Sequence, residues 1–297
     1  MKTVRILSVF LAGFMMLSGC CRTCSTTEVP SMSIRDRFDH RSGFFVASGD
    51  ARIYVEEKGD PAAPALLLLH GGLGQMEDFN AITPALAGKF RLVGVDSRGH
   101  GRSTLGRNGL SYATLEDDLA RIIDTLKLER FSILGFSDGG ITACRYAARG
   151  DARLEKIVTV GASWEMSITD PAWELLSSMT ARDWKEMFPE SCADYQRLNP
   201  EPDFDRLVAR AVEMWTDLGE GGYPGKRMAE TAAPLLMVRG DLDPLTSLES
   251  MAGLQALRPD VHVLNIPFAE HAAFAESPEI FLRAAEMFFT PKPDAQR

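Results

Sequence analysis

The sequence has 297 residues, enough for one large domain or two small ones. Hydrophobic residues make up 45% of it and charged residues 25%, a composition typical of globular proteins that bury a sizeable core. The formal net charge of -9 argues against nucleic acid or another polyanion as the main partner, and no internal apolar run is long enough to span a bilayer.

The N-terminus has the features of an export signal. Lys2 and Arg5 precede an apolar stretch over residues 6–17, which is too short for a comfortable transmembrane helix. The stretch ends in Leu-Ser-Gly-Cys, which resembles the bacterial lipoprotein processing box, whose cysteine is acylated; here it is Cys20. We expect residues 1–19 to be a lipoprotein signal peptide and Cys20 to carry a lipid anchor on the periplasmic side of a membrane. An ordinary secretory signal and an uncleaved anchor are the alternatives.

Residues 20–42 are polar and then charge-mixed, which predicts a flexible tether. Cys21, and not an aspartate, follows the acylated Cys20 at the second position of the mature chain, which in Gram-negative bacteria resembles sorting to the outer membrane. Cys24 also lies in this tether. The spacing of the cysteines does not indicate a zinc site. An oxidising compartment would permit a disulfide between Cys144 and Cys192, but nothing in the sequence requires one.

Beyond the tether, strand-like and helix-like segments alternate. Residues 65–69 form a continuous apolar run of the buried-strand type, and apolar residues recur at helical spacing over 114–126. The expected strands lie at 51–56, 65–69, 90–96, 131–135, 156–161, 234–239 and 261–266, and the expected helices at 78–87, 114–126, 139–149, 246–257 and 278–289. Such repeated units predict a mostly parallel sheet covered by helices on both faces.

The alternation breaks over residues 163–232, which have helical patches and a glycine-rich turn. This stretch holds all four tryptophans of the chain, Trp164, Trp173, Trp184 and Trp215. An insertion after the sixth strand would lie over the carboxyl ends of the strands, so we expect a helical cap there. Residues 43–162 and 233–290 would then form the two parts of the core, with 291–297 as a tail.

The sequence Gly135-Phe136-Ser137-Asp138-Gly139 follows the expected strand 131–135 and opens the expected helix 139–149. A Gly-x-Ser-x-Gly pattern is common by chance, but between a buried strand and a helix it indicates a nucleophile elbow. The helix N-terminus would stabilise negative charge that develops there. We therefore expect Ser137 to be a nucleophile, the alternative being an ordinary helix cap.

A serine hydroxyl needs a base, and the base needs an orienting acid, in the chain order serine, acid, histidine for this elbow. Only His262 and His271 follow Ser137. His262 lies inside an expected strand, whereas His271 lies in the loop after it, so His271 is the expected base and a capping role is its alternative. Both Asp241 and Asp243, just after the strand 234–239, could supply the acid.

The sequence Gly-Asp-x-Asp at 240–243 resembles the acid loop of the α/β-hydrolase family, in which the second aspartate contacts the histidine. This resemblance favours Asp243, with Asp241 as the alternative. An oxyanion needs two preset N–H donors, one of which is the backbone of the residue after the nucleophile, Asp138. The sequence His-Gly-Gly-Leu-Gly at 70–74 looks like the His-Gly turn of the same family, which implies Gly72 as the second donor and Leu73 as its alternative.

Residues 96–103 resemble the Asp-x-Arg-Gly-x-Gly-x-Ser turn of the same family, whose role is architectural, so His100 is not expected to react. His70 is expected to brace its own loop at 70–74. These motifs together span residues 65–271, and the chain is identified as a member of the α/β-hydrolase superfamily. The resemblance implies an eight-stranded-type, mostly parallel sheet flanked by helices, with a small helical cap. Dehalogenases and epoxide hydrolases of this fold have an aspartate at the nucleophile position, so the resemblance implies that Ser137 excludes those two chemistries.

The elbow also resembles that of the valacyclovir-hydrolase (biphenyl-hydrolase-like) group, in which an aspartate like Asp138 can receive a substrate ammonium. The alternative is that Asp138 caps the elbow helix. Apolar cap residues, with Trp164 as the tentative choice, could line an acyl site. We expect an enzyme that hydrolyses a small or medium carboxylic ester without cofactor or metal. C–C bond, thioester or aminoacyl hydrolysis, perhydrolysis, and a non-catalytic lipoprotein are the alternatives.

Overall fold

The computed structural model describes residues 36–107 and 109–290. The predicted signal peptide, the lipid-anchored Cys20, most of the tether and the tail lie outside the described residues. Within the described ranges no helix is both long and apolar enough to cross a bilayer.

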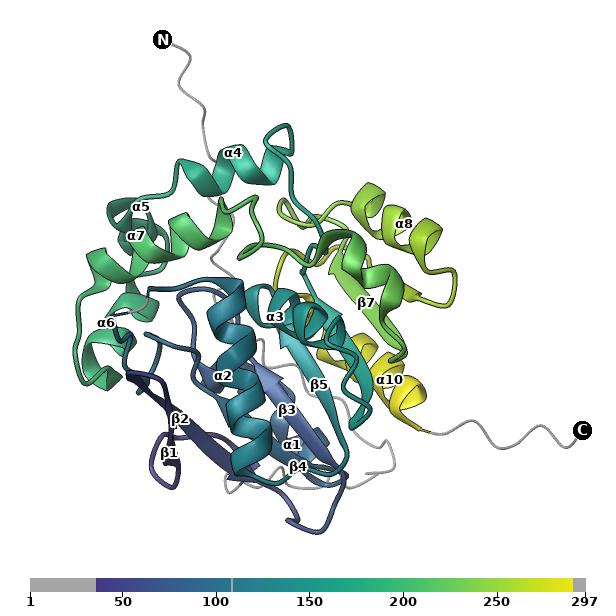
Figure 1. The fold of residues 1–297 in the computed structure, drawn as a ribbon, viewed down its shortest axis with the longest axis horizontal. Helices are drawn as coiled ribbons and strands as arrows, with labels where there is room; N and C mark the ends of the chain where they lie inside the picture. Colours follow the sequence, from purple (N-terminus) through teal and green to yellow (C-terminus); the bar gives the residue numbers. More distant parts are fainter. Residues whose placement is uncertain (1–35, 108, 291–297) are drawn as a thin grey trace, which may run out of the picture. The chain divides into compact units, whose positions relative to one another are not determined.

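The sheet has eight strands in the order β1-β2-β4-β3-β5-β6-β7-β8 (Figure 1). The first two pairings, β1 with β2 and β2 with β4, are antiparallel, and all the others are parallel. This confirms the predicted mostly parallel sheet. The strands are β1 Phe44–Ser48, β2 Ala51–Lys58, β3 Ala65–Leu69, β4 Arg91–Val95, β5 Phe131–Phe136, β6 Leu154–Val160, β7 Leu235–Gly240 and β8 His262–Ile266.

Strand β3 shows why its sequence is an unbroken apolar run. Successive side chains of a strand point to opposite faces, so Leu67 and Leu69 join the core on one side while Leu66 and Leu68 join the core on the other. Helices α2, α3 and α8 cover the first face, and α1, α9 and α10 cover the second. Their bounds are α1 Thr83–Ala87, α2 Tyr112–Thr125, α3 Asp138–Ala147, α8 Leu248–Leu257, α9 Ala273–Glu276 and α10 Pro278–Phe289.

Four further helices lie between β6 and β7, within the segment for which a cap is predicted (Figure 1). They are α4 Pro171–Ser177, α5 Ala181–Met187, α6 Pro189–Leu198 and α7 Phe204–Trp215, followed by the 3-10 turn η3 Gly225–Glu230. Helix α7 buries one face, with Phe204, Leu207, Val208, Ala211, Met214 and Trp215 spaced three or four residues apart. This face packs on Tyr112 of α2 and Ile141 of α3, so the cap helices share a core with the sheet-covering helices.

Two of the differences between the structure and the predicted elements have a clear physical reason. The helix predicted over 78–87 is a 3-10 helix, η2 Met76–Ala81, followed by the separate helix α1. Pro84 lies in the first turn of α1, where its missing N–H is not needed, and it could not sit inside one longer helix. Strand β1 was not predicted, since it is an edge strand with only Val46 and Ser48 buried and so has no continuous apolar run.

Two smaller features carry no part of the site. Cys144 and Cys192 are both free thiols, so the permitted disulfide is not formed, and burial raises the pKa of Cys144 to about 12.

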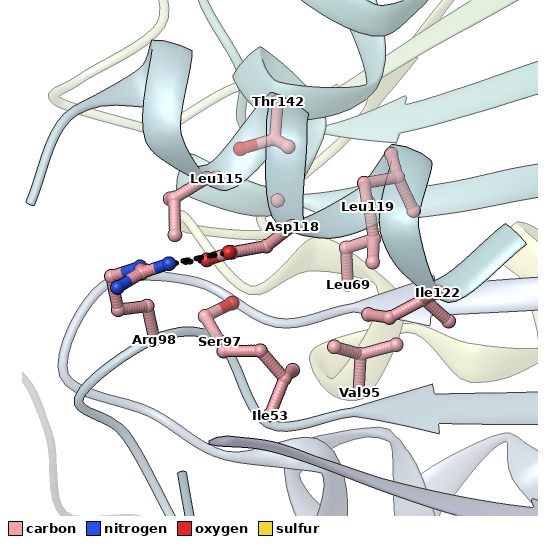
Figure 2. Close-up of a pocket in the computed structure, with 11 residues that line it drawn as sticks. Ile53, Leu69, Val95, Ser97, Arg98, Leu115, Asp118, Leu119, Ile122 and Thr142 are labelled. Atoms are coloured by element: carbon pink, nitrogen blue, oxygen red, sulfur yellow. Dashed lines mark hydrogen bonds and ion pairs between the residues drawn. The ribbon is translucent and has the colours of Figure 1, made fainter. Parts of the chain in front are cut away.

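A cavity of about 20 Å³ lies beside the ion pair of Arg98 and Asp118, among apolar side chains of the strands and of α2 (Figure 2). It is large enough for one water molecule, and Ser137 does not line it.

Candidate active site

Ser137 occupies the turn between β5 and α3. Its backbone has φ 49 and ψ -116, a region that is strained for any residue except glycine. Its N–H donates to the carbonyl of Val160 at 2.8 Å, and its carbonyl accepts from the N–H of Ile141 at 3.0 Å. Strand β6 and helix α3 therefore both hold the strained residue in place.

The glycines of the elbow are required by close packing. A Cβ on Gly139 would lie 2.0 Å from the carbonyl oxygen of Leu69, and one on Gly135 would lie 2.4 Å from the carbonyl oxygen of Gly139. Helix α3 can thus approach β3 and β5 closely only because both positions lack a side chain. This approach brings the N-terminus of α3 to the serine.

The loops after β7 and β8 bring an imidazole and a carboxylate to the serine. His271 Nε2 lies 3.0 Å from Ser137 Oγ, and His271 Nδ1 lies 3.0 Å from Asp243 Oδ1. The same Oδ1 accepts hydrogen bonds from the backbone N–H groups of Leu245 at 2.8 Å and Thr246 at 3.2 Å. Because a carboxylate can only accept here, Nδ1 is assigned the imidazole proton, which leaves the lone pair of Nε2 facing the serine.

The structure separates the two candidate acids. The side chain of Asp243 is buried against His271, whereas Asp241 is exposed at the surface. The backbone of Asp241 is bonded elsewhere, its N–H to the carbonyl of Ile266 at 3.0 Å and its carbonyl to Arg239 at 3.2 Å. Asp243 is therefore the carboxylate that the fold brings to the histidine.

The backbone around the serine offers N–H donors that helix bonding does not use. Asp138 is the first residue of α3, so its N–H has no partner within the helix. The N–H of Gly139 donates to the carbonyl of His70 at 3.1 Å. The N–H of Leu73, the alternative to Gly72, donates to His100 Nε2 at 3.0 Å.

Comparisons with known proteins agree with this geometry. The family model described as alpha/beta hydrolase fold matches residues 64–214. The chain belongs to the α/β-hydrolase superfamily. The match confirms the predicted family and identifies the chain as a hydrolase.

Several relatives of this α/β-hydrolase are enzymes. It is 27% identical to 2-(acetamidomethylene)succinate hydrolase of Mesorhizobium japonicum, over 84% of this chain and 96% of the relative. It is 29% identical to pimeloyl-[acyl-carrier protein] methyl ester esterase of Pectobacterium atrosepticum, over 73% of this chain and 90% of the relative. The meta-cleavage product hydrolase of Pseudomonas fluorescens has the same fold, with a TM-score of 0.71 and 18% identity over 84% of this chain and 97% of that one.

Two buried histidines brace the loops of this α/β-hydrolase. His70 Nε2 accepts from the N–H of Ser97 at 2.9 Å while its Nδ1 faces the carbonyl of Gly71 at 2.7 Å. His100 Nδ1 faces the carbonyl of Arg98 at 2.9 Å. Burial lowers the pKa of His70 and lowers that of His100 to about 3, so both remain neutral. Both ring nitrogens of each are occupied, which fits a structural role.

The two residues predicted to bind substrate are both buried. The carboxylate of Asp138 lies in the first turn of α3 and accepts hydrogen bonds from Tyr112 and from Trp215 on α7. Burial raises the pKa of Asp138, and these two donors partly oppose the rise. Trp164 donates from its indole to the carbonyl of Ser250 at 2.8 Å and packs in the core under α8. This placement does not support a substrate contact for Trp164.

Sequence reasoning missed two residues that join the cap to the site loops. Trp215 was predicted only as one of the apolar cap residues, which could pack the cap or line an acyl site. The helical spacing of α7 identifies it as buried without showing its bond to Asp138. Asn199, just after α6, donates from Nδ2 to the carbonyls of Gly99, Gly101 and Ser103 at 3.0 to 3.1 Å. No pattern in the sequence marks this asparagine.

A third histidine ties the N-terminal segment to the loops near the site. His40 Nε2 lies 2.8 Å from Asp96 Oδ2, and His40 Nδ1 lies 2.6 Å from Glu77 Oε1. Asp96 is fully buried and also accepts from the N–H groups of Met76 and Arg102. Burial opposes protonation of His40, but Asp96 and then Glu77 outweigh it and raise the pKa of His40 to about 9.

This raised pKa predicts a pH-dependent stability. His40 binds its proton more tightly in the folded chain than in the unfolded chain, where its pKa is the ordinary 6.5. Its contribution to the free energy of unfolding is therefore complete below about pH 6.5 and is lost as the pH rises through about 9. Over this window the free energy of unfolding should fall by up to about 3 kcal/mol. Urea unfolding at several pH values should show this fall in the wild type and not in His40→Gln. The exposed His262→Gln should keep the wild-type slope, and an equal slope in His40→Gln would contradict the assignment.

Proposed function

We propose that this chain is a serine esterase that hydrolyses a small or medium carboxylic ester through an acyl-enzyme on Ser137. The observation that carries the proposal is the hydrogen-bonded chain from Ser137 Oγ through His271 to Asp243, with both links at 3.0 Å. Nucleophile, base and acid come from the ends of β5, β8 and β7, where parallel strands place ligand-binding loops. The relative named as a methyl ester esterase supports an ester substrate.

The proposed reaction follows from the assigned protons. His271 Nε2 removes the proton of Ser137 Oγ as this oxygen attacks the ester carbonyl carbon, and Asp243 stabilises the imidazolium that forms. The N–H groups of Asp138 and Gly72 are the proposed donors to the oxyanion. His271 then protonates the leaving alcohol, and a water molecule, deprotonated by the same histidine, releases the acid.

A series of p-nitrophenyl acyl esters tests the proposal with the full chain. We expect turnover that is highest for short and medium acyl groups, together with stoichiometric labelling by a fluorophosphonate at Ser137. A chain that is labelled but cleaves only thioesters or C–C bonds would keep the nucleophile and overturn the ester assignment. The absence of both labelling and turnover would overturn the proposal as a whole.

We also propose that the chain is exported and held on the periplasmic side of a membrane by a lipid on Cys20. The support is the basic and apolar leader ending in Leu-Ser-Gly-Cys at 17–20. In a bacterial host, the wild type should incorporate labelled palmitate and fractionate with membranes, and Cys20→Ser should do neither. Equal labelling of both would contradict the anchor.

A further inference from the structure

The carboxylate of Asp138 is the polar centre of a buried cluster where the cap meets the core. Tyr112 Oη donates to Asp138 Oδ1 at 2.7 Å. The indole N–H of Trp215 is shared between Oδ1 at 3.0 Å and Oδ2 at 2.9 Å. Asp138 is only 6% exposed, so these two side chains replace the water that would otherwise solvate it.

Trp215 also lies against the second proposed oxyanion residue. A Cβ on Gly72 would come within 2.6 Å of Asp138 Oδ2 and 2.7 Å of Trp215 Cζ2. One indole therefore touches Gly72 with its ring and Asp138 with its N–H. The two residues whose backbone N–H groups are the proposed oxyanion donors thus share a single neighbour, which the cap supplies.

The backbone that carries Trp215 is itself fastened to the core. Tyr223 Oη donates to the carbonyl of Trp215 at 3.1 Å, and the ring of Tyr223 packs edge-on against Tyr112. In the loop between Trp215 and Tyr223, the carbonyl of Gly221 accepts from the N–H of Ala113 at 3.1 Å. Arg145 of α3 donates to carbonyls of the same loop. Because both the backbone and the indole of Trp215 are hydrogen-bonded, this side chain can fix the geometry of its partner Asp138.

We propose that Trp215 is a positioning residue for the oxyanion hole, holding the Asp138 carboxylate so that the backbone N–H of Asp138 stays aimed at the oxyanion. This inference rests on the proposed serine-esterase function. Asp138 is the first residue of α3, so a shift of this first turn that gives its buried carboxylate a new donor would carry the backbone N–H of Asp138 with it. An oxyanion donor contributes fully only at the right distance and angle, so a small shift is costly to the transition state and hardly affects substrate binding.

The variant Trp215→Phe removes the N–H and keeps an aromatic ring. Measured on the full chain and divided by the number of fluorophosphonate-reactive sites, its kcat should fall about tenfold, less than the roughly hundredfold loss of a whole oxyanion donor, with KM within about twofold. The affinity for a trifluoromethyl ketone, which forms a tetrahedral oxyanion, should fall by the same factor. A merely structural role would reduce the number of reactive sites and leave the kcat per site unchanged.

The matched control is Trp184→Phe, which removes an indole from the same cap cluster. The ring of Trp184 lies 6.4 Å from that of Trp215, and its N–H faces Ser191 rather than Asp138. Trp184→Phe should therefore keep its kcat per site. Tyr112→Phe, which removes the other donor to Asp138, should lower kcat as well, and it tests the same cluster if Trp215→Phe does not fold.

A double-mutant cycle decides whether Trp215 acts through the carboxylate. Asp138→Ala keeps the backbone N–H, so in that background Trp215→Phe should cause no further loss of kcat. A full tenfold further loss, or an unchanged kcat in Trp215→Phe alone, would overturn the inference while leaving the esterase proposal intact. A wild type that hydrolyses no ester would instead show that the proposed function fails.

Discussion

Replacing Ser137 by alanine is expected to lower kcat for ester hydrolysis by about 10⁴- to 10⁶-fold. The variant removes the oxygen that lies 3.0 Å from His271 Nε2, and no acyl-enzyme can form without it. A p-nitrophenyl ester assay with burst analysis measures the loss, and a fluorophosphonate probe should no longer label the chain.

Ser137→Ala should leave the fold intact, so its loss of kcat can be compared directly with the wild type. The strained backbone at φ 49 is held by hydrogen bonds of the Ser137 N–H and C=O, which alanine retains. The thermal midpoint of Ser137→Ala should therefore stay within a few degrees of the wild type. Residual turnover within tenfold of the wild type would show that another residue is the nucleophile.

Replacing Asp243 by alanine should lower kcat by about 10⁴-fold, whereas Asp241→Ala should change it less than about threefold. Asp243 Oδ1 lies 3.0 Å from His271 Nδ1, and in the proposed mechanism it orients this histidine and stabilises its imidazolium, while Asp241 is exposed two residues away. The same ester assay measures both variants. Equal losses in the two would contradict the assignment of Asp243 as the acid.

Asp243→Asn separates charge from geometry at this position. Its amide oxygen can keep the contacts of Oδ1 with His271, Leu245 and Thr246. The amide nitrogen would then take the place of Oδ2, which is buried without a partner among the described residues. The kcat of Asp243→Asn should therefore lie between those of the wild type and Asp243→Ala, because only the loss of the charge and the unpaired amide group lower it.

Much of the fold followed from local sequence patterns. Residues 65–69 were predicted as a strand and form β3 at the same bounds, because a strand buried on both faces needs an unbroken apolar run. The helix predicted at 278–289 is α10 at the same bounds, with Pro278 at its first position. The edge strand β1, half exposed, carried no such pattern.

The candidate site was predictable only where a residue type and its place after a strand coincide. Ser137 and His271 each satisfy both conditions, and the structure brings them together. Asp241 and Asp243 share one loop and one residue type, so only the folded turn separates them. Trp215 contacts Asp138 across 77 positions of sequence, and no local pattern encodes such a pairing.

The bond pattern of Asn199 limits how far the cap can be treated as an exchangeable module. One side-chain amide holds three carbonyls of the loop after β4, between 96 and 100 positions away in sequence. A cap transplanted from a relative without this asparagine would leave those buried carbonyls unpaired, at about 1–3 kcal/mol for each. Chimaeras designed to change substrate range should therefore take α6, Asn199 and the loop after β4 from the same parent.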